Sequence, residues 1–371
     1  MKEKVNRLVD YLKIYTNDTI IISDGAGWVI DNVSYNMSQS LCKKGIRSAV
    51  VSNIAIKNLT FLKGKTLYFV DRWSYLVKDS TEIFKKLSKN NRIIVMWWHS
   101  GAASNNAQLL SSLDTLKDLL PYVSIVHVSC HQEQKILIEE GALKEKVKVI
   151  PEGIEDFFKT LSEQERQAKR KLLKIPLDSF CIGFFQKDGI GWGEGNEPKL
   201  EKGPDVFIEV IKKVFEKNKN IFVVLTGPSR GYVKNKLKSL GIPFIHKYLS
   251  DYKDIIDYYS VLDLYLITSR TEGGPKSVLE AFACGVPVVS TKVGMCLDVI
   301  SDGDNGFLCD IEDVDSLCNK VNTLIADREL RVQIVESALK KAKEYRWGNV
   351  INGIINNCFE LQEKRQVKEY V

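Results

Sequence analysis

The sequence predicts an α/β protein built from two Rossmann-like domains, each with a parallel sheet covered by helices. Short apolar runs of strand length alternate with segments of helical periodicity along nearly the whole chain of 371 residues. That length is enough for two domains, each with its own hydrophobic core. A strand–loop–helix–strand unit at residues 263–290, with a glycine pair before its helix, is the third observation.

The composition is that of a soluble globular protein, with 44% hydrophobic and 27% charged residues. No run approaches the ~18 apolar residues of a transmembrane helix, and residues 1–18 lack the apolar core of a signal peptide. The eight cysteines form no C-x-x-C pair and have no histidine at zinc spacing. We therefore expect reduced thiols, no metal site and a cytoplasmic protein.

The net charge of +6 is unevenly distributed. Residues 1–175 hold 27 Lys+Arg against 19 Asp+Glu, whereas residues 176–371 hold 26 against 28. A basic first half suits an acidic acceptor or anionic lipid at the inner face of a membrane. A solvated lysine-rich surface is the simpler explanation. Arginine and aromatic residues are not interleaved as on a nucleic-acid-binding face, so no nucleic-acid partner is predicted.

The first predicted strand, residues 19–23, leads into a tight turn that contains Gly25 and Gly27. A helix follows up to Lys44. A strand–GxG–helix unit is compatible with a dinucleotide loop, but the third glycine of that motif is absent, which makes NAD a weaker alternative.

His99 directly follows another predicted strand of the first domain. In an open α/β sheet, ligands gather beyond the carboxyl ends of strands, so His99 is a candidate site residue. The alternative is a histidine that merely caps the strand end. We expect His127 and His131 to be structural. The remaining strands of this domain are predicted at residues 46–52, 67–70, 92–98 and 125–129.

The unit at residues 263–290 has the features of a phosphate site. Pro275 suits the first turn of a helix that Gly285 ends. Free amides and the positive end of the helix dipole favour phosphate there. Glu272 lies just before the helix and Glu280 about a turn and a half inside it, and a carboxylate accepts the paired hydroxyls of a ribose or sugar well. The pattern predicts a nucleotide-sugar site; a surface helix with two solvated glutamates is the alternative.

The two glutamates, separated by seven residues and followed by AFACGVPVV, resemble the E-x7-E signature of retaining GT4 glycosyltransferases. The resemblance spans the second domain and is sparse in the first. It implies the GT-B fold, in which two Rossmann-like domains face each other across a central cleft. It also implies an acceptor-side domain at 1–160, a nucleotide-sugar-binding domain at 175–349 and a crossover helix at about 350–371 that returns to the first domain.

The same resemblance assigns roles to residues. Glu272 orients the donor sugar, Glu280 holds the ribose, and His99 touches the sugar. Lys187 and Lys202 match the family's two cations, which stabilise the leaving diphosphate without a metal. The residues that match catalytic positions are Glu272, His99 and Lys202. Those that match donor-binding positions are Lys187, Lys202, Gly273, Gly274, Pro275, Lys276, Glu280, Gly25, Gly27, Tyr248 and Leu249.

The resemblance implies a retaining, metal-independent hexosyltransferase without a further cofactor. It would move a sugar from a nucleotide-diphosphate donor to a hydroxyl of a glycan or glycolipid, in the synthesis of cell-surface polysaccharide. UDP, GDP and ADP donors all fit, because backbone at Tyr248 and Leu249 is expected to pair with the base. The alternatives are a non-catalytic nucleotide-sugar-binding subunit and a phosphorylase or epimerase on the same fold.

Overall fold

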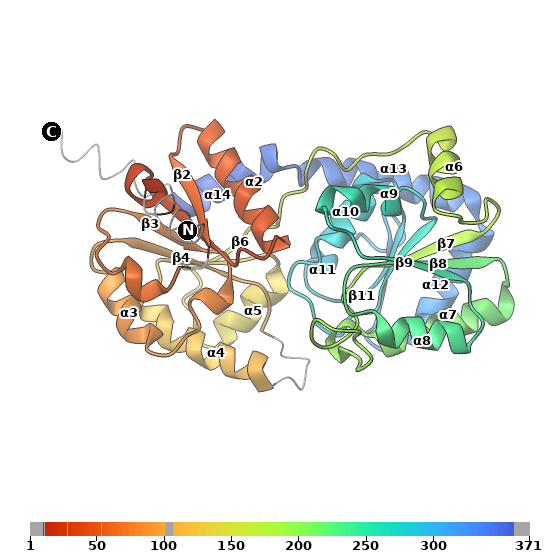
Figure 1. Cartoon of the computed structure of the whole chain (residues 1–371), viewed down its shortest axis with the longest axis horizontal. Coiled ribbons are helices and arrows are strands. Elements are labelled where there is room, and N and C mark those ends of the chain that lie inside the picture. Colours follow the sequence, from red (N-terminus) through yellow and green to blue (C-terminus); the bar gives the residue numbers. More distant parts are fainter. Residues whose placement is uncertain (1–9, 11, 28, 53, 101–106, 360–371) are drawn as a thin grey trace, which may run out of the picture. The chain divides into compact units, whose positions relative to one another are not determined.

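The computed structural model describes residues 10–359 except 11, 28, 53 and 101–106 (Figure 1). The described chain divides into two compact units. Unit 1 contains the segments up to Ser100, from residue 107 to Gly153, and from Arg346 onward, and unit 2 contains Ile154–Tyr345. The chain thus passes into unit 2 before residue 160, where the first domain was expected to end.

Unit 1 holds a six-stranded sheet in the order β2-β1-β3-β4-β5-β6, in which every pair is parallel. Three of its inner strands, β1, β3 and β5, are buried along their whole length, as a sheet covered by helices on both faces requires. The strands are β1 (Thr19–Ser23), β2 (Ser48–Ser52), β3 (Thr66–Phe69), β4 (Arg92–Trp97), β5 (Ile125–Val128) and β6 (Val147–Val149).

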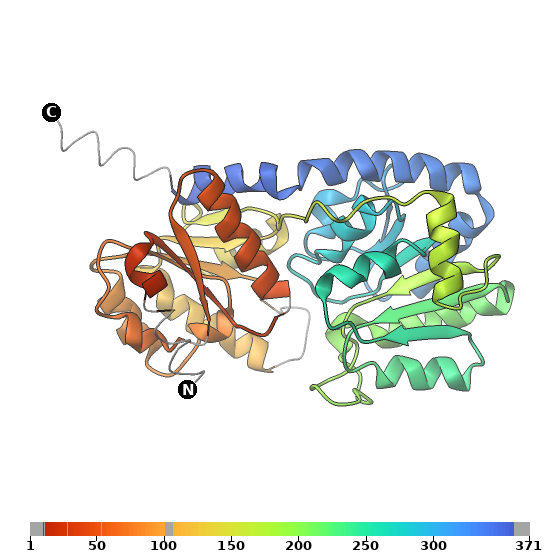
Figure 2. The same cartoon turned by 45° about the horizontal axis from the view of Figure 1, so that its top comes forward.

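The helices of unit 1 cover both faces of this sheet. On one face, α2 and α14 lie side by side and bury Met37 and Ile351 against Ile21 of β1 (Figure 2). On the other face, α3, α4 and α5 bury Phe84 and Leu116 in a second cluster. Residues 360–371 of the predicted crossover helix lie outside the described residues. The helices are α2 (Val29–Lys43), α3 (Ser80–Leu87), α4 (Ala107–Leu119), α5 (His131–Glu139) and α14 (Trp347–Cys358).

Unit 2 holds a second six-stranded parallel sheet, in the order β12-β11-β10-β7-β8-β9. Its strands are β7 (Phe180–Phe184), β8 (Ile221–Thr226), β9 (Phe244–Lys247), β10 (Leu264–Ile267), β11 (Val288–Thr291) and β12 (Phe307–Cys309). Its helices are α6 (Glu163–Leu172), α7 (Pro204–Lys217), α8 (Gly231–Ser239), α9 (Ile255–Tyr259), α10 (Ser277–Ala283), α11 (Cys296–Val299), α12 (Val314–Ala326) and α13 (Arg328–Glu344).

Each sheet has a topological switch point beside its first strand. In unit 1 the chain builds outward from β1 to β2 and then returns to place β3 on the other side of β1. In unit 2 the same reversal puts β10 beside β7. Loops at the carboxyl ends of such strand pairs diverge and leave room for a ligand. A ligand site is therefore expected at the carboxyl ends of β1 and β3 in unit 1 and of β7 and β10 in unit 2.

All eight cysteines are free thiols, and all but Cys42 are buried. Within the described ranges, no cluster of three or more His, Cys, Asp or Glu side chains could hold a metal ion. A search of the same residues finds no helix with the length and apolar character needed to cross a membrane.

Candidate functional site

Glu272 lies in the loop after β10, at the switch point of unit 2. Its side chain is 9% exposed. The ammonium of Lys202 donates to one oxygen at 2.7 Å, and the Ser269 hydroxyl donates to the other at 2.8 Å. These two bonds fix the direction of the carboxylate.

The loop that carries Lys202 is fastened to the loop that carries Glu272. Gly203 has φ +61°, and a Cβ there would lie 1.8 Å from the Thr268 carbonyl oxygen, so this close approach requires glycine. The Arg270 amide donates to the Glu201 carbonyl at 2.9 Å. Sequence reasoning found Lys202 and Glu272 separately, and the structure brings them together.

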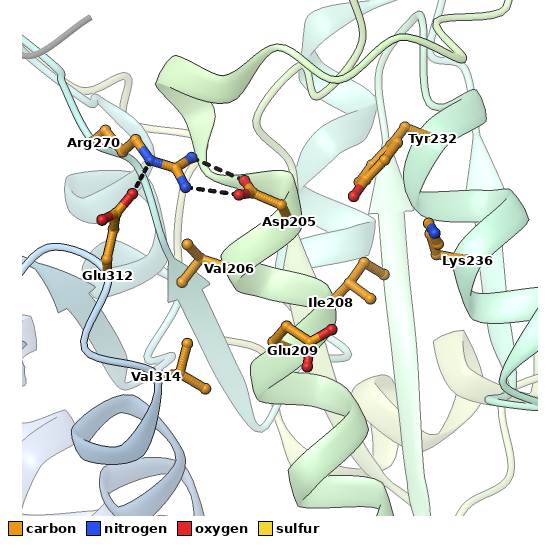
Figure 3. Close-up of a pocket in the computed structure, with 9 residues that line it drawn as sticks. All are labelled: Asp205, Val206, Ile208, Glu209, Tyr232, Lys236, Arg270, Glu312 and Val314. Atoms are coloured by element: carbon orange, nitrogen blue, oxygen red, sulfur yellow. Dashed lines mark hydrogen bonds and ion pairs between the residues drawn. The ribbon is translucent and has the colours of Figure 1, made fainter.

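Arg270 adds a side-chain clamp between the same loops. Its guanidinium makes two bonds to the Asp205 carboxylate, at 2.8 and 2.7 Å, one to the Leu200 carbonyl at 2.7 Å and one to Glu312 at 2.6 Å. Figure 3 shows Arg270 between the two carboxylates at one side of a 320 Å³ pocket. None of the residues predicted to bind the donor lines this pocket, so it is distinct from the candidate site. Its lining is Asp205, Val206, Ile208, Glu209, Tyr232, Lys236, Arg270, Glu312 and Val314.

Lys202 and Lys199 lie near Glu272, and Lys187 lies near Lys199. Burial lowers the pKa of Lys199, and the nearby charges of Lys202 and Lys187 lower it further. Burial also lowers the pKa of Lys187, whose ammonium lies 4.0 Å from the centre of the Trp192 ring. Sequence reasoning missed Lys199, although its position three residues before Lys202 was a usable signal. The result is a concentration of positive charge at the β7/β10 switch point.

The glycine pair presents backbone donors beside this cluster. Among the described residues, no group accepts a hydrogen bond from the amides of Gly273 or Gly274. Helix α10 begins at Ser277, two residues after Pro275, rather than at Pro275 as predicted. The reason is a tight turn in which the Lys276 amide donates to the Gly274 carbonyl at 2.8 Å.

Gly294 packs closely against the backbone of the glycine pair. It has φ +47°, and a Cβ there would lie 2.2 Å from the Gly273 carbonyl oxygen. The Met295 amide donates to that same oxygen at 2.7 Å. The backbone at Gly273 is therefore held in one orientation by the segment that follows β11.

Glu280 occupies an unexpected environment. It lies in the first turn of α10, not a turn and a half inside, because the helix starts later than predicted. Its carboxylate is 4% exposed and accepts hydrogen bonds from the hydroxyls of Tyr252 and Tyr259. Burial is the main cause of its raised pKa. The two tyrosine hydroxyls thus make the contacts that were predicted for a ribose.

Lys276 was predicted to bind the donor, and the structure places its ammonium on Glu155. The two distances to the carboxylate oxygens are 2.6 and 2.7 Å, and both residues are buried. The ammonium also lies 5.1 Å from the centre of the Tyr252 ring. Segment 154–160 is thereby attached to the start of α10.

A buried ion pair supports the glycine-rich loop after β7. Arg230 and Asp188 have no exposed side-chain surface, and their charged groups are 2.7 Å apart. Arg230 also donates to the Phe184 carbonyl at 2.7 Å. Burial raises the pKa of Asp188 to about 6 despite this partner. The two remaining predicted contacts, Tyr248 and Leu249, follow β9, with Tyr248 53% exposed.

The glycine loop of unit 1 is already filled by a carboxylate of the protein. Asp31 of α2 accepts the amide of Gly25 at 3.1 Å and that of Gly27 at 2.5 Å, and it also accepts the Ser23 hydroxyl. Burial raises the pKa of the neighbouring Asp24, and Asp31 raises it further. The amides of Gly25 and Gly27, which were predicted to contact donor phosphates, are therefore already bonded to Asp31.

The histidines of unit 1 differ in their surroundings. His99 is half-buried beyond the end of β4, and the following Ser100 is held by Glu133, which accepts its amide at 2.8 Å. His127 is buried, is bonded to Tyr68 and to the Ile150 carbonyl, and has its pKa lowered by burial to about 4, as suits a structural residue. His131 is exposed at the first residue of α5.

Comparison with known proteins gives a family match for part of unit 2. Residues 198–341 match the model of the family described as glycosyl transferases group 1. The chain is 27% identical over 244 residues to D-inositol 3-phosphate glycosyltransferase of Corynebacterium jeikeium, covering 62% of this chain and 56% of that protein. It is 30% identical over 149 residues to N-acetyl-alpha-D-glucosaminyl L-malate synthase of Bacillus anthracis, covering 40% and 39%. The chain spans about half the length of the curated relatives it matches.

Solved structures resemble the whole fold. Anabaena HepE in complex with UDP-glucose superposes with a TM-score of 0.72 at 19% identity, covering 93% of this chain and 99% of that one. Sucrose-phosphate synthase from Thermosynechococcus elongatus gives 0.72 at 15% identity, covering 95% and 99%.

The fold defined by these likenesses is GT-B, as predicted. Residues 198–341 match the model of the glycosyl transferases group 1 family, in agreement with the resemblance to GT4 glycosyltransferases.

Proposed function

We propose that the protein is a retaining glycosyltransferase that moves a sugar from a nucleoside-diphosphate donor to a hydroxyl group of an acceptor. The observation that carries the proposal is the Lys202–Glu272 pair at the switch point of unit 2, with Lys187 and Lys199 close by. The group 1 family match over the same residues supports it.

The charges suit the departure of a diphosphate. As the bond from the sugar to the diphosphate breaks, negative charge grows on the phosphate oxygens, and fixed cations stabilise it. Lys202 and Lys187 supply that charge, and the amides of Gly273 and Gly274 supply neutral donors. Because these groups are present in the chain itself, the proposal includes no metal and no further cofactor.

Glu272 has a different part in the proposed reaction. Lys202 and Ser269 hold its carboxylate in place, so it can accept hydrogen bonds from hydroxyls of the donor sugar. A fixed carboxylate also favours positive charge at the reacting carbon. Retention follows when the acceptor attacks the face from which the diphosphate leaves, with a diphosphate oxygen taking the acceptor proton. His99 is proposed to contact the sugar.

The donor and acceptor are proposed by class. HepE was solved with UDP-glucose, which supports UDP as the first nucleotide to test. The names of the two curated relatives contain D-inositol 3-phosphate and L-malate, both small hydroxyl compounds with negative charge. We propose a hydroxyl acceptor in cell-surface glycan or glycolipid synthesis. The basic first half of the chain supports peripheral contact with the inner face of a membrane.

The test is turnover. Purified protein is incubated with UDP-, GDP- and ADP-sugars and a mixture of hydroxyl acceptors, with and without EDTA, and release of the nucleoside diphosphate is measured. NMR of the product reports the anomeric configuration. The proposal expects one nucleotide to be released, without an effect of EDTA and with retention. Release of sugar phosphate from glycan and inorganic phosphate would instead show a phosphorylase.

A further inference from the structure

We propose that Arg72 binds an anionic group of the acceptor, a phosphate or a carboxylate, at the switch point of unit 1. This inference rests on the proposed function, because it names the chemistry of the acceptor. Arg72 was not among the residues that the sequence singled out, and the family match at residues 198–341 does not reach it.

Position is the first argument. Arg72 opens the short 3-10 helix Arg72–Ser74 that directly follows β3. The β1/β3 pair is the switch point of this sheet, where loops diverge at the carboxyl ends of the strands. The glycine loop follows β1 at the same edge, and His99 and Ser100 follow the neighbouring β4.

The state of the guanidinium is the second argument. Arg72 is 4% exposed, and in the described part of the chain neither Nη1 nor Nη2 has a hydrogen-bond partner. A buried polar group without a partner is costly, by about 1–3 kcal/mol per group and by more for a charge. The guanidinium carbon lies 4.7 Å from the centre of the Trp97 ring. This contact stabilises the cation, but it gives no hydrogen-bond acceptor to Nη1 or Nη2.

The acidic neighbours do not take the place of a ligand. Asp71 and Glu133 are near enough to act on Arg72 electrostatically, but among the described residues neither carboxylate makes a hydrogen bond to Nη1 or Nη2 of Arg72. Asp71 accepts the Trp73 amide at 3.1 Å, and Glu133 accepts the Ser100 amide at 2.8 Å. Burial raises the pKa of both carboxyls, to about 7 for Glu133, so the Glu133 carboxyl is only partly ionised near neutral pH.

The chemistry of the missing partner follows from these contacts. Nη1 and Nη2 together form a planar fork that matches two oxygens of a phosphate or a carboxylate. The neighbouring loop cannot serve the same anion, because Asp31 already accepts the amides of Gly25 and Gly27. An anion entering this edge therefore finds its donors on Arg72. This assigns the recognition of the charged end of the acceptor to unit 1.

The experiment uses inorganic phosphate as the probe in the full-length protein. Thermal unfolding is recorded with saturating UDP present, so that the donor site is filled, and phosphate is then titrated. We expect phosphate to raise the melting temperature of the wild type further, and Arg72→Gln to remove this second rise while keeping the rise caused by UDP. Arg72→Lys retains the charge without the fork and should weaken the apparent phosphate affinity about tenfold.

Arg47→Gln is the matched control, since Arg47 is an exposed arginine of unit 1 paired with Asp18 at 2.9 Å. It should leave both temperature rises unchanged. An undiminished phosphate effect in Arg72→Gln, or equal affinity in Arg72→Lys, overturns the inference. If Arg72→Gln does not fold, Arg72→Lys decides. Absence of any UDP effect, with phosphate still acting through Arg72, refutes the proposed donor site and leaves the anion site standing.

Discussion

Replacing Lys202 by methionine removes one cation while keeping a side chain of similar length. In the structure its ammonium is 2.7 Å from the Glu272 carboxylate, and the two side chains are 19% and 9% exposed. After the substitution, Glu272 keeps the hydrogen bond from the Ser269 hydroxyl, at 2.8 Å. Loss of one partner of a largely buried charged pair costs about 1–3 kcal/mol of folding stability.

The effect of Lys202→Met on turnover should be larger than its effect on stability. Removing one preorganised donor from a developing negative charge typically lowers kcat by about 10²–10³-fold. The assay is release of the nucleoside diphosphate at saturating donor, with isothermal titration of the same nucleotide. Because the charge grows as the bond breaks, kcat should fall more than affinity.

Lys213→Met is the matched control for this experiment. Lys213 pairs with Asp315 at the same 2.7 Å, but the two side chains are 44% and 81% exposed. Such exposed pairs contribute about 0–1 kcal/mol, so activity and stability should change little. A kcat of Lys202→Met within about threefold of the wild type, with the control also unchanged, would refute the assigned role of Lys202.

Three further changes test other contacts. Glu280→Ala should weaken nucleotide binding about 5- to 100-fold if its carboxylate holds the ribose. Tyr252→Phe should tighten binding, because the Tyr252 hydroxyl occupies one of the same carboxylate oxygens. Titration calorimetry measures both affinities, and tighter binding by Glu280→Ala contradicts the assignment. Glu133 has a folded pKa of about 7, raised from 4.5, so the folded state binds the extra proton and the free energy of unfolding should fall by up to about 3 kcal/mol as pH rises from 4.5 to 7. Urea denaturation of Glu133→Gln should show a flatter pH dependence, and an identical slope rejects the raised pKa. Gly294→Ala should displace the Gly273 backbone and weaken diphosphate binding, since its Cβ would lie 2.2 Å from that carbonyl oxygen; unchanged binding is the contrary result.

The strand–loop–helix–strand unit at residues 263–290 was predictable because its pattern is local in sequence. The strand up to Ile267, the glycine pair and the helix that ends before Gly285 all lie within one short stretch. The helix start was misplaced by two residues, because Pro275 suits a first turn equally well just before the helix. That small error also moved Glu280 into the first turn.

Contacts between distant segments were not predictable. Lys276 meets Glu155, which is 121 residues away in sequence, and no local pattern links them. The two tyrosines on Glu280 come from 21 and 28 residues earlier. Gly25 and Gly27 suggested a phosphate loop, and Asp31, a few residues later, was a signal against free amides that the glycine pattern concealed.

The central claim is that the β7/β10 switch point of unit 2 binds the diphosphate of a sugar donor. The most direct measurement is calorimetric titration of UDP, GDP and ADP into the wild type and Lys202→Met, each with EDTA. The account predicts that one nucleotide binds the wild type without a metal and that the variant binds it more weakly. Equal binding to both proteins, or no binding to the wild type by any of the three, would contradict it.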